Sequence, residues 1–142
     1  MSVSEILAQK GHSVITVRQD DDIAAVASLL AENKIGAVVV LETDGKVCGI
    51  VSERDLVRQI AGQGADALRL PVSSCMTTNV ISCHRSDPID RVMEQMTAGR
   101  FRHLPVIEDG ELCGLISIGD VVKRKIEQTE RDAEELKRYI AG

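Results

Sequence analysis

Aromatic side chains are almost absent from this chain of 142 residues, which holds one phenylalanine, one tyrosine and no tryptophan. The hydrophobic core must therefore be aliphatic, and the stacking surfaces on which single-stranded nucleic acids usually bind are missing. The net charge of −5 offers no general attraction to a phosphate backbone either. We therefore expect no nucleic-acid partner.

Long apolar runs are also missing. No stretch approaches the roughly 20 apolar residues that cross a bilayer, and the opening MSVSEILAQK has no basic segment followed by an apolar run. We expect a cytoplasmic protein that does not enter a membrane. The four cysteines form no CxxC motif, so reduced and mostly buried thiols are expected rather than disulfides.

Signatures of catalysis are not found. His12, His84 and His103 have no metal-ligand spacing with one another or with the cysteines. The chain also has no Gly-rich phosphate loop and no G-x-S-x-G motif. These absences predict a protein that is not an enzyme and that requires no metal.

What the chain does contain is an internal duplication. Residues 45–57 (GKVCGIVSERDLV) and 110–122 (GELCGLISIGDVV) match at six of thirteen positions, and four more positions stay apolar. In both copies a buried strand ends in Ser and reaches Asp three residues later. The repeat is about sixty residues long, and two copies of that length indicate one pseudo-symmetric domain rather than a solenoid.

Each copy predicts the element order β-α-β-β-α. A β-branched run leads through acidic residues into an amphipathic helix. Two further strands are joined by an Asp-Gly turn, and a last helix begins at the Ser. The expected strands are residues 14–17, 37–41 and 50–51 in the first copy and 80–83, 104–107 and 115–116 in the second.

The expected organisation has four parts. Residues 1–60 form the first repeat, 61–71 a Gly-containing connection, 72–125 the second repeat and 121–142 an amphipathic helix. Each copy opens with a short segment, residues 3–7 or 72–76, that is expected to pack as a helical turn on the repeat. In the last helix a heptad seam runs with spacings 4, 3, 4, 3 and 4. Either it packs on its own domain or it contacts a second subunit. The seam residues are Val122, Ile126, Thr129, Ala133, Leu136 and Ile140.

The segments MTTNVISC and RHLPVIEDGELCGLISIGDVV, together with their counterparts in the first copy, make the chain similar to a tandem pair of cystathionine β-synthase (CBS) domains. The resemblance covers nearly all of residues 1–125. It implies an α/β fold in which two repeats pack sheet against sheet about a pseudo-two-fold axis. It also implies two clefts for adenosine-containing ligands, a regulatory role without catalysis, and pairing of modules into a homodimer.

The Ser-x-x-Asp elements have two interpretations. Ser before a helix with an acidic residue three positions later forms a capping box, which needs no ligand. A short carboxylate at this place can also accept hydrogen bonds from both ribose hydroxyls, while free N–H groups at the helix start attract phosphate. In that second interpretation Asp55 and Asp120 bind ribose, and Ser52 and Ser117 lie near phosphate.

The remaining candidates follow the family pattern. Ile81, Leu104 and Pro105 would flank the base in one cleft, although the core is an alternative place for each of them. Ile15, Val38 and Val39 would do so in the other cleft, where Gly36 and Ala37 leave room. The candidate phosphate-binding cations are Arg54, Arg102 and His103, with Arg124 as a further possibility.

Three functions stay open at this point. The first is a sensor of adenosine nucleotides, with AMP as first choice and ADP, ATP, NAD(H) or S-adenosylmethionine as alternatives, that modulates a partner protein. The second is a constitutive scaffold whose Ser-x-x-Asp elements are only helix caps. The third is a thiol redox sensor that acts through Cys75 or Cys83.

Overall fold

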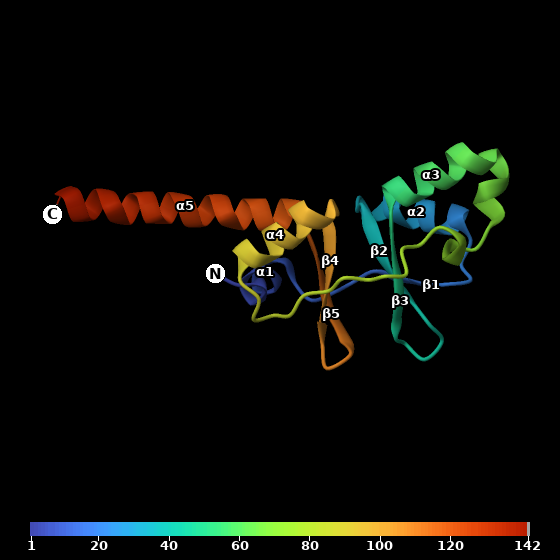
Figure 1. The fold of residues 1–142 in the computed structure, drawn as a ribbon, viewed down its shortest axis with the longest axis horizontal. Helices are drawn as coiled ribbons and strands as arrows, with labels where there is room; N and C mark the ends of the chain where they lie inside the picture. Colours follow the sequence, from blue (N-terminus) through green and yellow to red (C-terminus); the bar gives the residue numbers. More distant parts are fainter. Residues whose placement is uncertain (142) are drawn as a thin grey trace. The chain divides into compact units, whose positions relative to one another are not determined.

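The structure is a computed structural model that describes residues 1–141, and it divides into two compact units (Figure 1). The first-repeat unit comprises Ser13–Ile81 and Gly110–Leu112. The second-repeat unit comprises Met1–His12, Ser82–Asp109 and the chain from Cys113 onward. The amino-terminal segment therefore belongs to the unit of the second repeat.

The first-repeat unit is built around a three-stranded sheet of order β1-β2-β3. β1 runs parallel to β2, and β2 and β3 form the expected antiparallel hairpin around an Asp-Gly turn. The connection expected at residues 61–71 is largely helical, because the α-helix that ends at Gln63 is followed directly by a 3-10 helix. The elements are β1 (Thr16–Arg18), α2 (Ile23–Asn33), β2 (Ala37–Leu41), β3 (Val47–Ser52), α3 (Glu53–Gln63), η1 (Gly64–Arg69) and η2 (Val72–Ser74).

The second-repeat unit is built around the two-stranded sheet β4-β5. Its last helix is the longest element of the chain, with 24 residues. The elements are α1 (Val3–Lys10), α4 (Ile89–Gly99), β4 (His103–Glu108), β5 (Glu111–Ser117) and α5 (Ile118–Ala141). The predicted α/β fold class and the order β-α-β-β-α are confirmed, with one exception in this unit.

The exception is the first strand of the second copy, where the prediction of a strand at residues 80–83 is wrong. Only one parallel bridge forms, between Cys83 and Val106, with Cys83 N–H donating to the Pro105 carbonyl at 3.0 Å. Proline has no N–H, so it cannot donate the bond that would extend this ladder upstream of Cys83. In the first copy Val39 stands at the corresponding place and pairs with Thr16 in β1.

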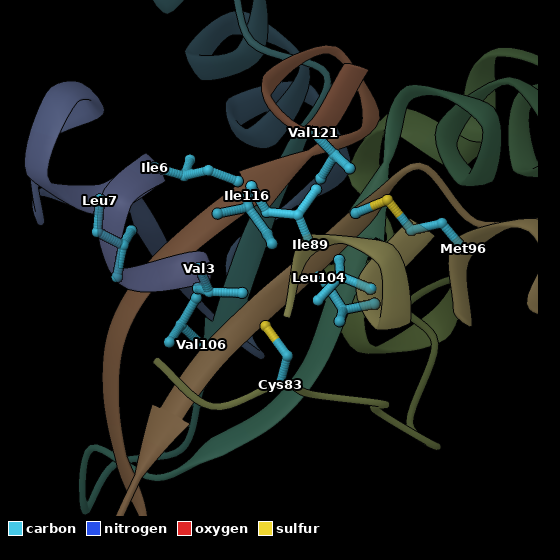
Figure 2. Close-up of a cluster of buried hydrophobic side chains, with 11 residues drawn as sticks. Val3, Ile6, Leu7, Cys83, Ile89, Met96, Leu104, Val106, Ile116 and Val121 are labelled. Atoms are coloured by element: carbon cyan, nitrogen blue, oxygen red, sulfur yellow. The ribbon is translucent and has the colours of Figure 1, made fainter. Parts of the chain in front are cut away.

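Each unit has its own aliphatic core, as the composition predicts. The core of the second-repeat unit includes side chains from α1 together with side chains of α4, β4 and β5 (Figure 2). Alternation along the strands puts one face of each sheet on its core. The buried residues of this core are Val3, Ile6, Leu7, Cys83, Ile89, Val92, Met96, Leu104, Val106, Ile116 and Val121.

The two opening segments are exchanged between the copies. A Cβ placed on Gly114 in β5 would lie 2.6 Å from Leu7 Cδ2, and a Cβ on Gly49 in β3 would lie 2.6 Å from Met76 Sδ. The opening segment of each copy thus packs against the strand that precedes the Ser-x-x-Asp element of the other copy. At both places the strand carries glycine, because any larger residue would collide with the incoming side chain.

Helix α5 changes its surroundings along its length. Its first turns contain the buried residues Val121 and Arg124, and the helix packs against α4 and α1. From Thr129 to Ala141 every residue is exposed. Over residues 129–141 the heptad seam therefore does not pack on its own domain.

Candidate functional site

In the first copy the Ser-x-x-Asp element forms a complete capping box at the start of α3. Asp55 Oδ2 accepts hydrogen bonds from the Ser52 N–H at 2.9 Å and from the Ser52 hydroxyl at 3.1 Å. In return the Asp55 N–H donates to Ser52 Oγ at 3.4 Å. The capping interpretation is confirmed here, and it occupies one of the two carboxylate oxygens.

The second copy repeats the same reciprocal bonds at the start of α5. Asp120 Oδ2 accepts from the Ser117 N–H at 2.8 Å, and the Asp120 N–H donates to Ser117 Oγ at 3.1 Å. The second copy adds a lysine: Lys10 Nζ lies 2.7 Å from Asp120 Oδ2 and 2.8 Å from the Leu115 carbonyl oxygen. Lys10, at the end of α1, therefore bonds both to strand β5 and to the cap of α5.

The charge of Asp120 is stabilised by these contacts. Burial by itself opposes ionisation, but the hydrogen bonds from Lys10 and Ser117 and the positive charge of Lys10 outweigh it, so the pKa of Asp120 is lowered. The side chain keeps 26% of its surface exposed. The second copy therefore presents a carboxylate that is ionised at neutral pH and that solvent can reach.

Backbone hydrogen bonds bring two predicted residues beside the caps. The Glu53 N–H donates to the Gly36 carbonyl at 3.0 Å, and the Ile118 N–H donates to the Arg102 carbonyl at 2.7 Å. Each bond joins the first residue of the helix to the residue before the central strand of the same repeat. The two positions correspond, so the second copy places an arginine where the first has no side chain.

A hollow of about 260 Å³ adjoins Asp120 on the surface of the second-repeat unit. Lys10 and Lys123 contribute two cations to its wall. Arg124 also lines it, but its guanidinium is engaged by Glu5 and Glu127, each at 3.1 Å. The full lining is Ile6, Gln9, Lys10, Asp120, Lys123 and Arg124.

The predicted base-pocket residues fall into three groups. Val38 and Leu104 are fully buried in the hydrophobic cores, so only their backbones could meet a ligand. Ala37, Val39 and Pro105 are buried on the opposite faces of their strands, where alternation places them. The half-buried or exposed members are Ile15, Gly36 and Ile81, and Ile81 is 46% exposed.

Among the predicted cations, Arg54 and Arg102 are exposed and His103 is half-buried. Sequence reasoning did not identify Lys10, Gln9 and Lys123. Lys10 is 110 positions away from Asp120, and no local pattern relates the two residues. The exchange of the opening segments brings them together, and that exchange has no signature in a single sequence.

The thiols offer little support for redox sensing. None of the four cysteines, all within residues 1–141, is in a disulfide; Cys83 is buried and the other three are half-buried. Burial, reinforced by Asp87 and Glu108, raises the pKa of Cys83 to about 12. Burial and the charge of Asp55 raise the pKa of Cys75 as well. Because the thiolate is the reactive form, both thiols are less reactive than an ordinary cysteine.

No group of three or more His, Cys, Asp and Glu side chains within residues 1–141 is arranged to hold a metal ion. None of the helices described there combines the length and the apolar character that a bilayer crossing demands.

Comparison with known proteins gives consistent matches. The chain matches the CBS domain family over residues 3–62 and 72–127. It is 52% identical to the CBS-domain containing protein ATU1752 from Agrobacterium tumefaciens, whose crystal structure superposes with a TM-score of 0.85 over 87% of this chain and 92% of that one. It is 30% identical to the mitochondrial CBS domain-containing protein CBSX3 of Arabidopsis thaliana, over 99% of this chain and 72% of that protein.

A more distant structure shares the fold. The CBS domain pair of protein MJ0100, crystallised in complex with 5′-methylthioadenosine and S-adenosyl-L-methionine, is 23% identical and has a TM-score of 0.79 over 90% of this chain and 98% of that one. The duplicated capping boxes, the two β-α-β-β-α repeats and the family match at both repeats lead to one conclusion: the chain is a tandem CBS domain pair and belongs to the CBS domain family.

Proposed function

We propose that this CBS pair is a regulatory module that binds an adenosine-containing ligand and thereby changes its affinity for a partner protein. The ligand class comprises AMP, ADP, ATP, NAD(H) and S-adenosylmethionine, with AMP as first choice. Such a ligand can regulate only if its affinity differs between two states of the module. The proposal includes no catalytic step, a cytoplasmic location, and a homodimer formed by pairing of CBS modules.

The observation that carries the proposal is the environment of Asp120. Its carboxylate is ionised and partly exposed, and its hydrogen bonds from Lys10 Nζ and the Ser117 N–H both engage Oδ2. This leaves Oδ1 as an acceptor for a sugar diol, since a carboxylate offers about four lone-pair sites. The hollow beside it has Lys10 and Lys123 in its wall, which gives positive charge for a phosphate.

Supporting arguments come from the rest of the site and from one relative. Arg102 is held at the cap by the hydrogen bond of its carbonyl, and its exposed guanidinium supplies a further cation. The pair from MJ0100 was crystallised with two adenosine compounds, which supports the choice of ligand class. Asp55 has the same cap but, within residues 1–141, no lysine partner, so we propose that the site of the second repeat is the tighter one.

A nucleotide panel tests the proposal by thermal shift and by calorimetry of binding. A ligand present at a hundred times its Kd stabilises the folded state by about 2.7 kcal/mol, which raises the Tm of a domain of this size by roughly 5–10 °C. Asp120→Ala should abolish the shift, and Asp55→Ala should reduce it less. Asp66→Ala, in the exposed part of η1, is the control and should leave the shift unchanged.

The scaffold is the second candidate, because the capping boxes are complete in both copies without any ligand. It predicts that no adenosine compound moves the melting curve of the wild-type protein. It also predicts that Asp120→Ala lowers the Tm by a similar amount with and without each compound. That outcome would reject the sensor.

A further inference from the structure

We propose that α5 joins two copies of this chain through a parallel two-stranded coiled coil. The proposed interface is the α5 seam, which consists of the exposed residues at heptad spacing along this helix. It is independent of nucleotide binding, so either proposal can fail without the other. The α5 seam comprises Val122, Ile126, Thr129, Ala133, Leu136 and Ile140.

The α5 seam is mostly apolar, and its large apolar side chains are exposed. Val122 is 42% exposed, Ile126 54%, Leu136 59% and Ile140 76%. Thr129 is the one polar member, and its hydroxyl already donates to the Lys125 carbonyl at 2.9 Å. The threonine can therefore turn its methyl group to a partner helix without leaving a buried hydroxyl unsatisfied.

The residue types along the α5 seam favour a coiled coil of two helices. The heptad spacing assigns Ile126, Ala133 and Ile140 to the a positions and Val122, Thr129 and Leu136 to the d positions. Isoleucine fills two of the three a positions and leucine one of the three d positions, and isoleucine at a with leucine at d is the arrangement typical of parallel dimers. The α5 seam spans about 27 Å at 1.5 Å per residue, which is short for a coiled coil. We therefore expect a modest affinity that depends on the flanking charges.

The flanking charges determine the direction of the second helix. In a parallel pair each g residue faces the e residue five positions later in the other helix. Lys125 then faces Glu130 of the second copy, and Asp132 faces Lys137 of the second copy. Symmetry repeats both contacts, so all four pairs are attractive.

An antiparallel pair would place like charges together, because e then faces e and g faces g. With the same apolar layers, Glu130 would face Glu130 of the second copy and Asp132 would face Asp132 of the second copy. Lys123 would face Lys137 of the second copy. Three like-charge contacts therefore argue against this direction.

The ion pairs within the chain leave the charges beside the α5 seam available to a second copy. Charges of α5 outside the α5 seam pair along the helix, as in Arg124–Glu127 and Glu134–Arg138. Glu130, Asp132 and Lys137 flank the α5 seam, and within residues 1–141 none of them has an ion pair or side-chain hydrogen bond. Lys125 already contacts Asp90 at 2.9 Å, so Asp132 and Lys137 make the better test.

Sedimentation velocity of the full chain, over a hundredfold range of concentration at low salt, tests the interface. We expect a reversible dimer. Asp132→Lys or Lys137→Asp alone should weaken association by about tenfold, because each turns two attractive pairs into repulsive ones. The two substitutions together should restore wild-type association. Arg131→Glu on the outer face is the control and should change association little.

Cross-linking tests the direction. Ile140→Cys should give a disulfide-linked dimer under mild oxidation if the helices are parallel, since the two substituted positions then lie side by side. In an antiparallel pair they would be about 27 Å apart. The wild type is the control for the four native cysteines. A monomer at every concentration, association that does not respond to the charge reversals, or no cross-link at position 140 would overturn the proposal.

Discussion

The two repeats share a backbone device and differ in what surrounds it. In both, Ser and Asp form reciprocal bonds at a helix start, and the helix is tied to the residue before the central strand. The second repeat adds Lys10, Arg102 and Pro105 around this cap, whereas the first has Gly36 and Val39 at the places of Arg102 and Pro105. Duplication has kept the local geometry, while the chemistry that a ligand would meet has diverged.

The units also differ in how firmly the exchanged opening segments are held. Leu7 is 1% exposed, and three residues of α1 belong to the core of the second-repeat unit. From the other opening segment, residues 72–76, Val72 alone belongs to the buried core of the first-repeat unit, and Met76 is only half-buried at its edge. The second-repeat unit thus depends on a segment from the far end of the chain, and the first-repeat unit depends less on its counterpart.

Shortening one side chain in each opening segment should give the largest difference in stability between the two repeats. Leu7→Ala should lower the free energy of unfolding by about 2–5 kcal/mol, because it leaves a cavity in a fully buried site. Met76→Ala should cost about 1 kcal/mol, since a half-buried side chain has less apolar surface to lose. Urea denaturation followed by circular dichroism measures both.

A double mutant tests the contact itself. Gly114→Ala alone should destabilise by about 1–3 kcal/mol, because the new methyl group would overlap Leu7. Combined with Leu7→Ala, the methyl group enters the space that the leucine leaves, so the cost of the pair should be less than the sum. Additive costs would mean that α1 does not pack on β5 in solution.

The next largest difference should come from the Cys83 thiol, which makes the free energy of unfolding depend on pH. Cys83 occupies the place that Val17 holds in the first repeat, and its pKa is raised from 9.0 to about 12. The folded state then keeps a proton that the unfolded state loses, so stability falls as the pH rises above 9.0. By about pH 10 the wild type should have lost about 1.4 kcal/mol relative to Cys83→Val.

Chemical denaturation of both proteins at a series of pH values measures this difference. The other titrating groups cancel because both proteins contain them. A gap between the two that stays constant from about pH 8 to about pH 10 would show that the thiol ionises freely in the folded state.

Much of the fold could be predicted because its signals are local. The Asp-Gly turn between β4 and β5, the apolar spacing of α4 and the Ser caps each lie within a few residues of the element that they define. The same holds for the duplicated Ser117 and Asp120, whose bonds span three residues. The duplication then doubled the evidence for each element.

The failures concern relations that no local pattern contains. The strand expected at residues 80–83 was wrong because its partner strand carries Pro105, and the consequence of a missing N–H appears only once the register is known. Lys10 was missed because it reaches Asp120 through the exchange of the opening segments. A single sequence shows that both copies have such a segment but not which copy receives it.

The smallest expected effect concerns Lys10, which distinguishes the two caps. The Lys10 side chain is 40% exposed and that of Asp120 is 26% exposed, so solvent weakens their ion pair. Lys10→Met should lower the free energy of unfolding by about 0.2–1 kcal/mol at neutral pH and low salt. The corresponding residue of the second opening segment is Asn79, so the substitution makes the second cap resemble the first.

The pH dependence separates this ion pair from the packing of the lysine stem. Because the pKa of Asp120 is lowered in the folded state, its contribution is present above the ordinary value of 3.8 and is lost as the pH falls through the lowered one. The difference between wild type and Lys10→Met should therefore shrink below pH 3.8. Lys123→Met, in the wall of the same hollow but without a bond to Asp120, should show no such decline. Equal acid profiles for the two variants would mean that Lys10 does not distinguish the repeats, since the second carboxylate would then be held by its cap alone, as Asp55 is.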